Sequence, residues 1–404
     1  MTAATGRFEV VVAGAGPAGA VAALVLARAG RRVLLVDDRA DAHRAAPLKV
    51  GETLPPAARP LLRDLGLWAD FTTTAHVRST GTLACWGSPG LHGRSHLFDP
   101  DGHGWHLDRN RFDASLCDAA VAAGARLLHA TAVRYLTRGT DRRLLVRQQG
   151  AIRELRTDWV VDATGRRAVV GRRRAARLRQ DRLVAAFTLF DQPVPGGRAR
   201  DEELRTLVEA VPEGWWYTAR IPAGRLVAHL TDVDLLSPAL RTPAGFLDRA
   251  ARTRHLRARL HGYVPPAATP RWTAAHGLRL CPAAGAGWIA AGDAALAFDP
   301  LSSQGILTAL HTGAQAGRAV DALLRGAADA LAAYSAFLDG IADAYRNHHA
   351  HSYAQERRWP DHPFWRRRHA RDAPVCPAPL GTAHRSVQSD QKRVNITDVA
   401  RTER

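Results

Sequence analysis

The segment FEVVVAGAGPAGAVAALVLARAGRRVLLVDD, residues 8–38, constrains the fold more than any other part of the 404-residue chain. A short apolar run leads into a glycine-rich turn. Small and aliphatic residues of helical character follow and end at Gly30, and a second apolar run ends in two acids. This order predicts a βαβ unit, whose two parallel strands require a parallel sheet covered by helices. The sequence therefore predicts an α/β fold.

The turn inside this unit reads Gly14-Ala15-Gly16-Pro17-Ala18-Gly19, which fits G-x-G-x-x-G directly after a strand and at the start of a helix. The first glycine permits the tight turn, the second lets the backbone approach a pyrophosphate, and the third lets the helix pack on the strand. An acid about 20 residues further on is expected to bind a ribose hydroxyl. Asp37, followed by Asp38, closes the next strand there. We predict a dinucleotide site at these residues; a glycine-rich turn without a ligand is the alternative.

The net charge of +18 comes almost entirely from arginine, because the chain has only two lysines, Lys49 and Lys392. A codon bias toward arginine explains such an excess without any function, and an acidic protein partner or an anionic ligand explains it as well. The basic stretches at 165–179 and 365–371 lack a groove-reading motif. We therefore expect no nucleic-acid binding.

The four cysteines stand far apart, without a C-x-x-C pair. This spacing favours neither a disulfide framework nor a zinc site, and it fits a reducing cytoplasm; we predict no bound metal. No run of about 18 apolar residues occurs, and the N-terminus lacks the charged and apolar regions of a signal peptide. We expect a cytoplasmic protein without a membrane span.

Three further segments, far apart in the sequence, are each typical of elements that surround one long cofactor. They are WHLDRNRFDASL at 105–116, VVDATG at 160–165 and GDAALAFDP at 292–300. With the glycine turn they make the chain resemble, over residues 8–350, the FAD-dependent monooxygenases and halogenases of the p-hydroxybenzoate hydroxylase-like fold. The resemblance implies an α/β fold with a Rossmann-type FAD-binding domain of the GR2 type. It also implies an inserted, mainly antiparallel β-sheet domain for the substrate, and C-terminal helices.

The resemblance implies FAD as the cofactor and assigns residues to it. It places Asp293, which follows Gly292, at the ribitol chain, and Arg109 near the ribose and phosphates. It places Pro300 and the turn after it beside the isoalloxazine ring. The rest of the predicted cofactor-binding set is Lys49, Ser303, Gln304 and Gly305.

We expect four regions along the chain. The FAD-binding domain is discontinuous and the substrate domain is inserted into it, because strand-like segments rich in aromatic residues interrupt the dinucleotide-binding pattern. The expected regions are 1–71, 105–182 and 276–325 for FAD binding, 72–104 and 183–275 for the substrate sheet, 326–380 for a C-terminal helical segment, and 381–404 for a polar tail.

Within this family, KVGETLPPAARPLLRDLGLW (49–68) and GWWYTARIPAGRLVAHLTD (214–232) resemble the tryptophan-halogenase-like branch. That branch includes halogenases of indoles and oxygenases of tryptophan. The halogenase motif W-x-W-x-I-P has Tyr217 and Ala219 here in place of both tryptophans. Ala84 stands at the position of the halogenase lysine, and Ser302 at that of its glutamate. A relay needs an amine and a general base needs a carboxylate, so the sequence favours oxygenation over halogenation.

Three residues are candidates for catalysis. Trp216, between Trp215 and Tyr217 on one expected strand, is a candidate to stack on an aromatic substrate, although such residues are as often ordinary core. His229 on the next strand is a candidate acid or base, against a structural role. Glu52 is the acid in the GET segment, and capping of the following helix is its alternative role.

We therefore expect an FAD-dependent monooxygenase that hydroxylates an indole or similar ring. The resemblance is closest in motifs to the flavoproteins of peptidyl-tryptophan quinone cofactor biogenesis, of the cysteine tryptophylquinone type. The expected partner is an aromatic small molecule or an acidic tryptophan-bearing peptide or protein. Because no second G-x-G-x-x-G follows a strand, electrons are expected from transiently bound NAD(P)H or from a separate flavin reductase. The alternatives are a flavin-dependent halogenase, an O₂-independent flavin reductase or dehydrogenase, and a basic binding protein.

Overall fold

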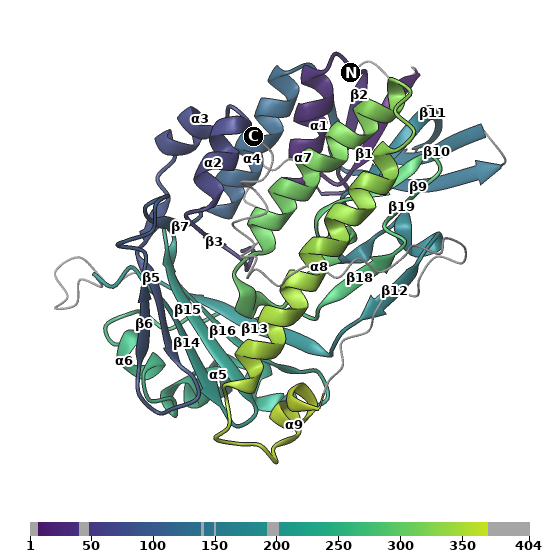
Figure 1. Cartoon of the computed structure of the whole chain (residues 1–404). Helices are drawn as coiled ribbons and strands as arrows, with labels where there is room; N and C mark the ends of the chain where they lie inside the picture. Colours follow the sequence, from purple (N-terminus) through teal and green to yellow (C-terminus); the bar gives the residue numbers. More distant parts are fainter. Residues whose placement is uncertain (1–6, 40–47, 139–140, 149–150, 192–201, 371–404) are drawn as a thin grey trace.

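The computed structural model describes residues 7–39, 48–138, 141–148, 151–191 and 202–370, and it confirms the predicted α/β fold (Figure 1). A sheet with a parallel centre and helices against it forms one half of the molecule, and a mainly antiparallel sheet forms the other. The predicted polar tail at 381–404 lies outside the described residues. The four-region division of the chain stays a prediction.

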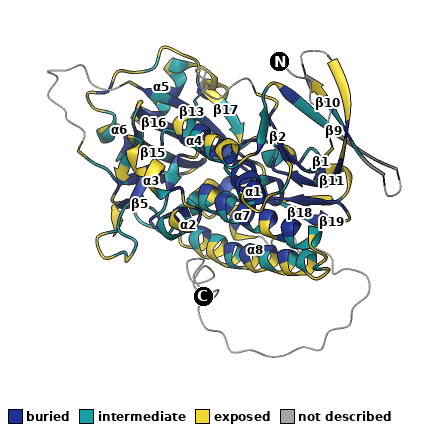
Figure 2. Ribbon diagram, turned by 90° about the horizontal axis from the view of Figure 1, so that it is seen from above, coloured by how far each residue is buried: buried dark blue, intermediate teal, exposed yellow. Residues whose placement is uncertain are grey.

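The predicted βαβ unit is present. It consists of β1 (Phe8–Ala13), α1 (Pro17–Arg28) and β2 (Val33–Val36). The two strands pair in parallel, with Val11 opposite Leu34. The apolar runs become strands because their side chains are almost fully buried in the main core. The buried sheet and α1 lie at the centre of the molecule in Figure 2.

This sheet has eight strands, and six of them follow the order β19-β20-β11-β1-β2-β8. Strands β9 and β10 extend it as an antiparallel hairpin beside β11, which the sequence did not indicate. The pairs β1–β11, β11–β20 and β2–β8 are parallel. The remaining strands are β8 (Arg126–Leu128), β9 (Thr131–Arg138), β10 (Asp141–Gln148), β11 (Ala151–Asp162), β19 (Ala284–Gly285) and β20 (Trp288–Ala290).

The second large sheet has seven strands in the order β17-β13-β16-β15-β14-β5-β6. Its pairs are antiparallel except for the parallel pair β14–β5. The strands are β5 (Gly81–Cys85), β6 (His92–Ser95), β13 (Leu183–Phe190), β14 (Thr206–Val211), β15 (Gly214–Ile221), β16 (Gly224–Asp232) and β17 (Arg271–Ala274). Separate apolar clusters cover its two faces, so the side chains of its inner strands alternate between two different cores, whereas β6 at the edge is exposed.

Two small sheets and several short helices connect these halves. One small sheet joins β12 (Ala176–Arg179), β18 (Leu278–Cys281) and β21 (Leu296–Ala297), and the other joins β3 (Thr53–Leu54), β7 (Gly104–His106) and β4 (Val77–Ser79). The helices are α2 (Ala58–Asp64), α3 (Trp68–Thr73), α4 (Arg109–Ala122), α5 (Pro243–Ala251) and α6 (Leu256–Arg259). The short 3₁₀ turns are η1 (Gly165–Arg167), η2 (Gly171–Arg173), η3 (Pro238–Arg241), η4 (Gly292–Ala294) and η5 (Pro300–Ser302).

Three helices end the described chain: α7 (Gly305–Leu324), α8 (Ala330–Ala354) and α9 (Pro363–His369). Helix α7 packs against α1 at close range, since a Cβ atom at Gly313 would lie 2.3 Å from the carbonyl oxygen of Ala18. Helix α8 runs beside α7, as Figure 1 shows. The aromatic side chains of α9, Phe364 and Trp365, are fully buried against the seven-stranded sheet.

Two other expectations can be compared with the described residues. None of their helices is long and apolar enough to cross a membrane. Cys85 and Cys117 are buried free thiols, whereas Cys281 is disulfide-bonded. The sequence favoured no disulfide framework, and the bonded state of Cys281 departs from that expectation.

Candidate functional site

A cavity of about 1030 Å³ lies where the carboxyl ends of the parallel strands meet the seven-stranded sheet. Strands β1, β2, β11 and β20 all end at it, and ligands of open α/β sheets bind at such ends. Its volume is at the upper limit of the usual range for small-molecule sites, about 300–1,000 Å³. The cavity can therefore accept a large ligand that reaches from one sheet to the other.

The glycine turn forms one end of the cavity. Gly14 has a φ of +98°, and a Cβ atom there would lie 2.3 Å from the carbonyl oxygen of Ala163. A Cβ atom at Gly19 would lie 1.8 Å from the carbonyl oxygen of Gly14, so both positions require glycine. Gly16 differs, because its Cβ direction meets no atom within 4 Å. Gly16, Pro17 and Ala18 line the cavity, and Gly19 lies behind them.

The start of α1 is open toward this space. Gly16 is its N-cap, no side chain caps its first N–H groups, and its first turn holds no acid. Such a helix start attracts an anion through free N–H groups and the helix dipole. The glycine turn therefore fits the pyrophosphate of a dinucleotide, as the sequence predicts.

Asp37 lies beside this turn at the end of β2 and is almost fully buried. Its carboxylate accepts a hydrogen bond from the Ala15 N–H at 2.7 Å and from Arg39 Nε at 2.8 Å. Burial alone would raise the pKa of Asp37, but the hydrogen bonds and charge of Arg39 outweigh burial and hold that pKa below its usual range. Asp38 also lines the cavity and pairs with Arg167 Nη1 at 2.6 Å. Sequence reasoning did not find Arg39 or Arg167, although Arg39 follows the two acids directly.

Lys49 and Arg109 line the same part of the cavity and share one acid. Lys49 Nζ lies 2.7 Å from Asp113 Oδ2, and Arg109 Nη2 lies 3.2 Å from Asp113 Oδ1. Asp113 belongs to the segment WHLDRNRFDASL, four residues after Arg109, and was not predicted as a site residue. Two cations on one buried carboxylate leave net positive charge for a phosphate.

Asp293 follows the end of β20, within the turn η4. Its carboxylate pairs with Arg166 Nη1 at 2.7 Å, and both residues line the cavity. Gly292 lies just behind, with a φ of +59° and a Cβ direction that would reach 2.7 Å from the Ala18 side chain. Gly292 therefore allows close packing on α1, while Asp293 is the residue that faces the cavity.

The turn from Pro300 to Gly305 forms another wall. Pro300, Ser303 and Gly305 line the cavity, and Ser303 has a left-handed φ of +52°. The Ser303 N–H donates to the Pro300 carbonyl at 3.0 Å, and the Gln304 N–H donates to Ser302 Oγ at 3.3 Å. These two N–H groups are therefore engaged inside the turn, and the Gln304 side chain is not part of the cavity wall.

Asp299 holds this turn from behind. Its buried carboxylate accepts hydrogen bonds from the Leu301 N–H at 2.9 Å and from Tyr353 Oη at 2.8 Å, and it lies 3.3 Å from His349 Nε2. Burial would raise the pKa of Asp299, but His349 and the hydrogen bonds lower it overall. Asp181 lies close enough to form an Asp181–Asp299–His349 group of metal-ligand type, with ligand atoms within 4.8 Å of one another. The hydrogen bonds of Asp299 give it a structural role in fixing the turn.

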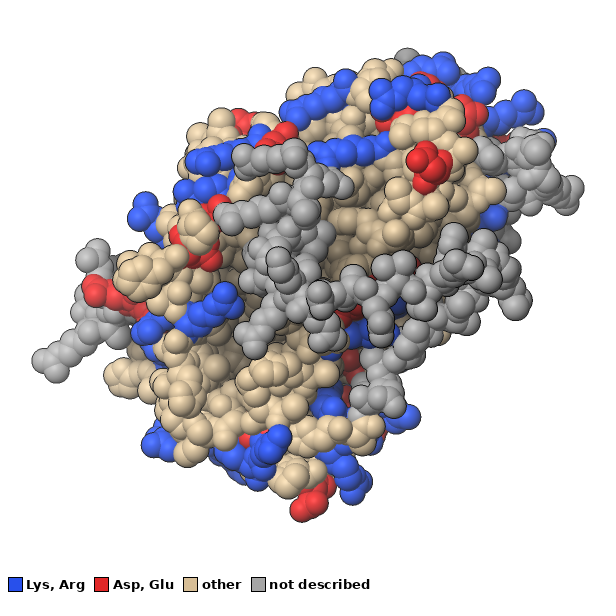
Figure 3. All heavy atoms as spheres, in the orientation of Figure 1, with Lys and Arg blue, Asp and Glu red and all other residues tan. Residues whose placement is uncertain are grey.

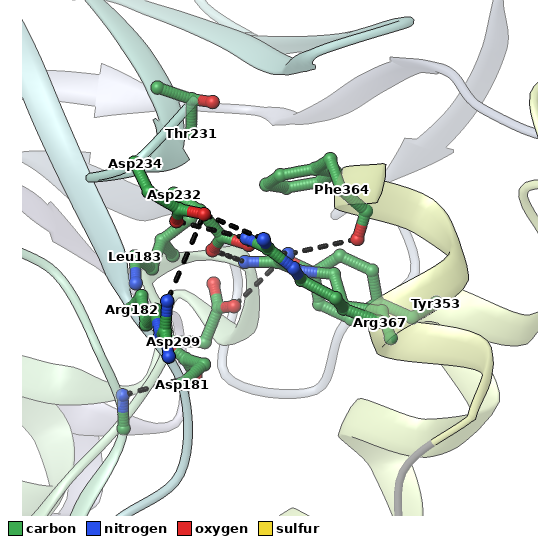
Figure 4. Close-up of polar contacts among 12 residues, drawn as sticks. Asp181, Arg182, Leu183, Thr231, Asp232, Asp234, Asp299, Tyr353, Phe364 and Arg367 are labelled. Carbon is green, nitrogen blue, oxygen red and sulfur yellow. Dashed lines mark hydrogen bonds and ion pairs between the residues drawn. The ribbon is translucent and has the colours of Figure 1, made fainter. Parts of the chain in front are cut away.

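A second acid ties the same region to α9, as Figure 4 shows. Asp232, at the end of β16, pairs with Arg367 Nη1 at 2.9 Å and with Arg368 Nη2 at 2.9 Å. Arg367 also contacts Asp234. Through these ion pairs and through Tyr353, the last described helices support the turn at Pro300.

The seven-stranded sheet forms the far wall of the cavity. Tyr217 on β15 lines it, beside small and apolar residues of neighbouring strands, which are Ala185, Ala228, Leu230 and Ala274. The Tyr217 hydroxyl donates to Glu52 Oε1 and lies 2.9 Å from Thr53 Oγ1. Burial and the Glu52 carboxylate raise the pKa of Tyr217 well above its usual range, and burial raises that of Glu52. Glu52 is 1% exposed and is not part of the cavity wall, but its carboxylate contacts two residues that are, Tyr217 and Gly51.

Trp216 and His229 lie on the opposite face of this sheet. They are direct cross-strand partners, with ring centroids 4.6 Å apart, and Trp216 also packs on Phe246 of α5. Burial lowers the pKa of His229 to about 3. Neither of these two candidate catalytic residues lies at the cavity. Side chains on a strand alternate between faces, and on β15 it is Tyr217, not Trp216, that points to the cavity.

The comparisons with known proteins agree with this geometry. Residues 7–344 match the FAD binding domain family. The protein LodB of Marinomonas mediterranea, named as an FAD-dependent oxidoreductase, is 27% identical over 370 residues, which are 90% of this chain and 97% of LodB. The structure of the peptidyl tryptophan dihydroxylase QhpG, described as essential for tryptophylquinone cofactor biogenesis, is 25% identical with a TM-score of 0.71 and covers 90% of this chain and 79% of QhpG.

The myxobacterial chondrochloren halogenase CndH has a TM-score of 0.80 at 22% identity, and the match covers 90% of this chain and 86% of CndH. At that identity the likeness shows a shared fold. The matched family model spans most of the chain, and it includes the glycine turn, Asp37, Asp293 and the turn at Pro300. The chain therefore belongs to the FAD binding domain family and is an FAD-dependent oxidoreductase.

Proposed function

We propose that this protein is a monooxygenase that hydroxylates an indole ring, and that its substrate is a tryptophan within a peptide or protein during maturation of a quinone cofactor of the cysteine tryptophylquinone type. The observation that carries the proposal is the single cavity that joins the glycine turn, the turn at Pro300 and an apolar wall around Tyr217. The similarity to QhpG and LodB supports the choice of substrate.

Different residues at the cavity would bind different parts of FAD. The start of α1 and the Lys49–Arg109 pair would hold the pyrophosphate of FAD, Asp37 would hold its adenosine ribose, and Asp293 its ribitol chain. When bound and reduced, FAD supplies the electrons that activate O₂. The protein positions the ring against the wall at Tyr217 and excludes water from it. NAD(P)H or a separate flavin reductase would supply the electrons.

Two positions favour oxygenation over halogenation. Ala84 on β5 is not part of the cavity wall, and Ser302 Oγ donates to the Asp299 carbonyl at 2.9 Å inside its own turn. Lys49, the one lysine among the described lining residues, is ion-paired with Asp113. None of these groups offers a free amine or a carboxylate to the space beside the Pro300 turn.

The excess of positive charge fits an acidic protein substrate. Figure 3 shows Lys and Arg side chains at several separate places on one face, with fewer acidic ones. A surface of this kind raises the rate at which an acidic partner arrives, and salt screens the effect. We therefore expect kcat/KM for an acidic tryptophan peptide to fall with ionic strength more steeply than for N-acetyl-L-tryptophanamide.

The test is mass spectrometry of these two substrates after reaction with reduced holoenzyme and ¹⁸O₂. The proposal expects the heavy isotope in the product, on the indole ring, in buffers with and without bromide. A bromine isotope pattern would identify a halogenase instead. Turnover that proceeds equally well without O₂ would identify a reductase or dehydrogenase.

A further inference from the structure

The far wall of the cavity holds one phenol with an unusual set of partners. Tyr217 comes from β15, lines the cavity, and is flanked by Ala185, Ala228 and Leu230. Its hydroxyl contacts Glu52 and Thr53, which come from a distant part of the chain at the start of β3. A polar atom in an apolar wall orients whatever binds there.

The hydrogen bonds around Tyr217 determine what this phenol can offer. Glu52 is 1% exposed, and its carboxylate accepts hydrogen bonds from the Gly51 N–H at 2.9 Å and from the Tyr217 hydroxyl. The single phenol proton is thereby used, so Thr53 Oγ1, at 2.9 Å, donates its own proton to the phenol oxygen. A hydroxyl oxygen has two lone pairs, and one is left over. Toward the cavity, Tyr217 therefore acts as an acceptor.

We propose that Tyr217 Oη accepts a hydrogen bond from the ring N–H of the substrate and that Glu52, as a positioning residue, holds the phenol in that orientation. The inference rests on the proposed function and names the feature of the ring that the site selects, a donor N–H on a flat aromatic system. An isosteric ring without that donor leaves the phenol acceptor unpaired. Such a loss costs about 1–3 kcal/mol, or roughly 5- to 150-fold in affinity.

The experiment compares two probes on the oxidised FAD holoenzyme, without reductant. The first is N-acetyl-L-tryptophanamide, and the second is its benzothiophene analogue, in which sulfur replaces the N–H. Binding is measured by calorimetry and by the change in flavin absorbance. The wild type is expected to bind the indole at least 5-fold more tightly. Tyr217→Phe is expected to bind both probes with nearly equal Kd, because no acceptor remains.

Two further variants keep the test decisive. Tyr217→Phe leaves the Glu52 carboxylate buried without its phenol, so the double variant with Glu52→Gln removes that charge if the single variant fails to fold. Trp216→Phe is the matched control: it changes the adjacent aromatic residue on the opposite face of the sheet and is expected to keep the wild-type ratio. Glu52→Gln alone is expected to give an intermediate ratio.

The inference is overturned if the wild type binds both probes equally or neither of them, or if Tyr217→Phe keeps the wild-type ratio. Flavin absorbance of each variant shows whether the cofactor site is intact. A wild type that prefers indole but never incorporates ¹⁸O would refute the proposed function and leave the Tyr217 contact standing. If ¹⁸O enters the product but the wild type binds indole and benzothiophene equally, the Tyr217 contact is refuted and the proposed function stands.

Discussion

Two glycines of the same turn should fail in different ways when a side chain is added. A Cβ atom at Gly19 would lie 1.8 Å from the Gly14 carbonyl oxygen, and real Cβ atoms essentially never come closer than 3.0 Å. Helix α1 would have to move by more than an ångström in the middle of the core. Overpacking of this kind costs about 1–3 kcal/mol or more, so Gly19→Val is expected to destabilise the protein whether or not FAD is present.

Gly16→Val should affect only the ligand. Gly16 has an ordinary extended backbone with a φ of −79°, and its Cβ direction meets no atom within 4 Å, so the apoprotein is expected to change by less than about 1 kcal/mol. The new methyl groups would occupy the space predicted for the pyrophosphate. At an FAD concentration 100 times its Kd, the wild type gains about 2.7 kcal/mol from binding, and Gly16→Val is expected to gain none.

The assay is chemical denaturation of the wild type and both variants, with and without FAD, together with flavin absorbance after gel filtration. Gly340→Ala, at an exposed position in α8 with no atom near its Cβ direction, is the control and should keep the full FAD effect. Retention of bound FAD by Gly16→Val would refute the assignment of the glycine turn to the pyrophosphate.

Three more outcomes are expected. Asp232→Asn should cost about 3–5 kcal/mol in urea unfolding, because it leaves the buried Arg368 uncompensated, whereas the half-exposed Asp234→Asn should cost less than about 1 kcal/mol; equal costs would contradict this. Burial lowers the pKa of His229 to about 3 in the native state. Between about pH 6.5 and 3, His229 is therefore protonated in the unfolded chain but neutral in the native protein. The free energy of unfolding should therefore fall as pH drops from about 6.5 toward 3, and His229→Gln should flatten that slope. Asp37→Ala removes the acceptor of the Ala15 N–H and should weaken FAD binding about 10- to 100-fold in calorimetry, while an unchanged Kd would count against its role at the ribose.

The sequence predicted the half of the site that depends on local patterns. The βαβ unit, the glycine turn and the acid after β2 follow one another within 31 residues, so their geometry is set by nearby chain. Asp293 and the Pro300 turn were expected from a family resemblance, which also rests on short segments of sequence, and both line the cavity. Each of these features can be predicted from a short sequence pattern.

The rest of the candidate site depends on contacts between residues far apart in the chain, which no local sequence pattern encodes. The sequence placed Trp215, Trp216 and Tyr217 on one strand, but only the packing of Phe246, a residue of α5, on Trp216 shows that Trp216 lies on the face away from the cavity. Glu52 meets Tyr217 across 165 positions of chain. The role of Asp299 likewise required the position of α8, which a periodicity cannot give.

The anchoring of Asp299 also sets an order of assembly for the nascent chain. Three residues of α8, Tyr345, His349 and Tyr353, contact Asp299, and they are synthesised about 50 residues after it. The N-terminal parts of a chain leave the ribosome first and are available to fold before the parts that follow them. The glycine turn, Asp37 and the parallel strands can thus come together early, while the wall at Pro300 gains its support only when α8 has docked. Tight capture of the cofactor should therefore be a late event of biogenesis, and a ribosome-bound chain that stops before Tyr345 should carry the complete glycine turn and still release FAD quickly.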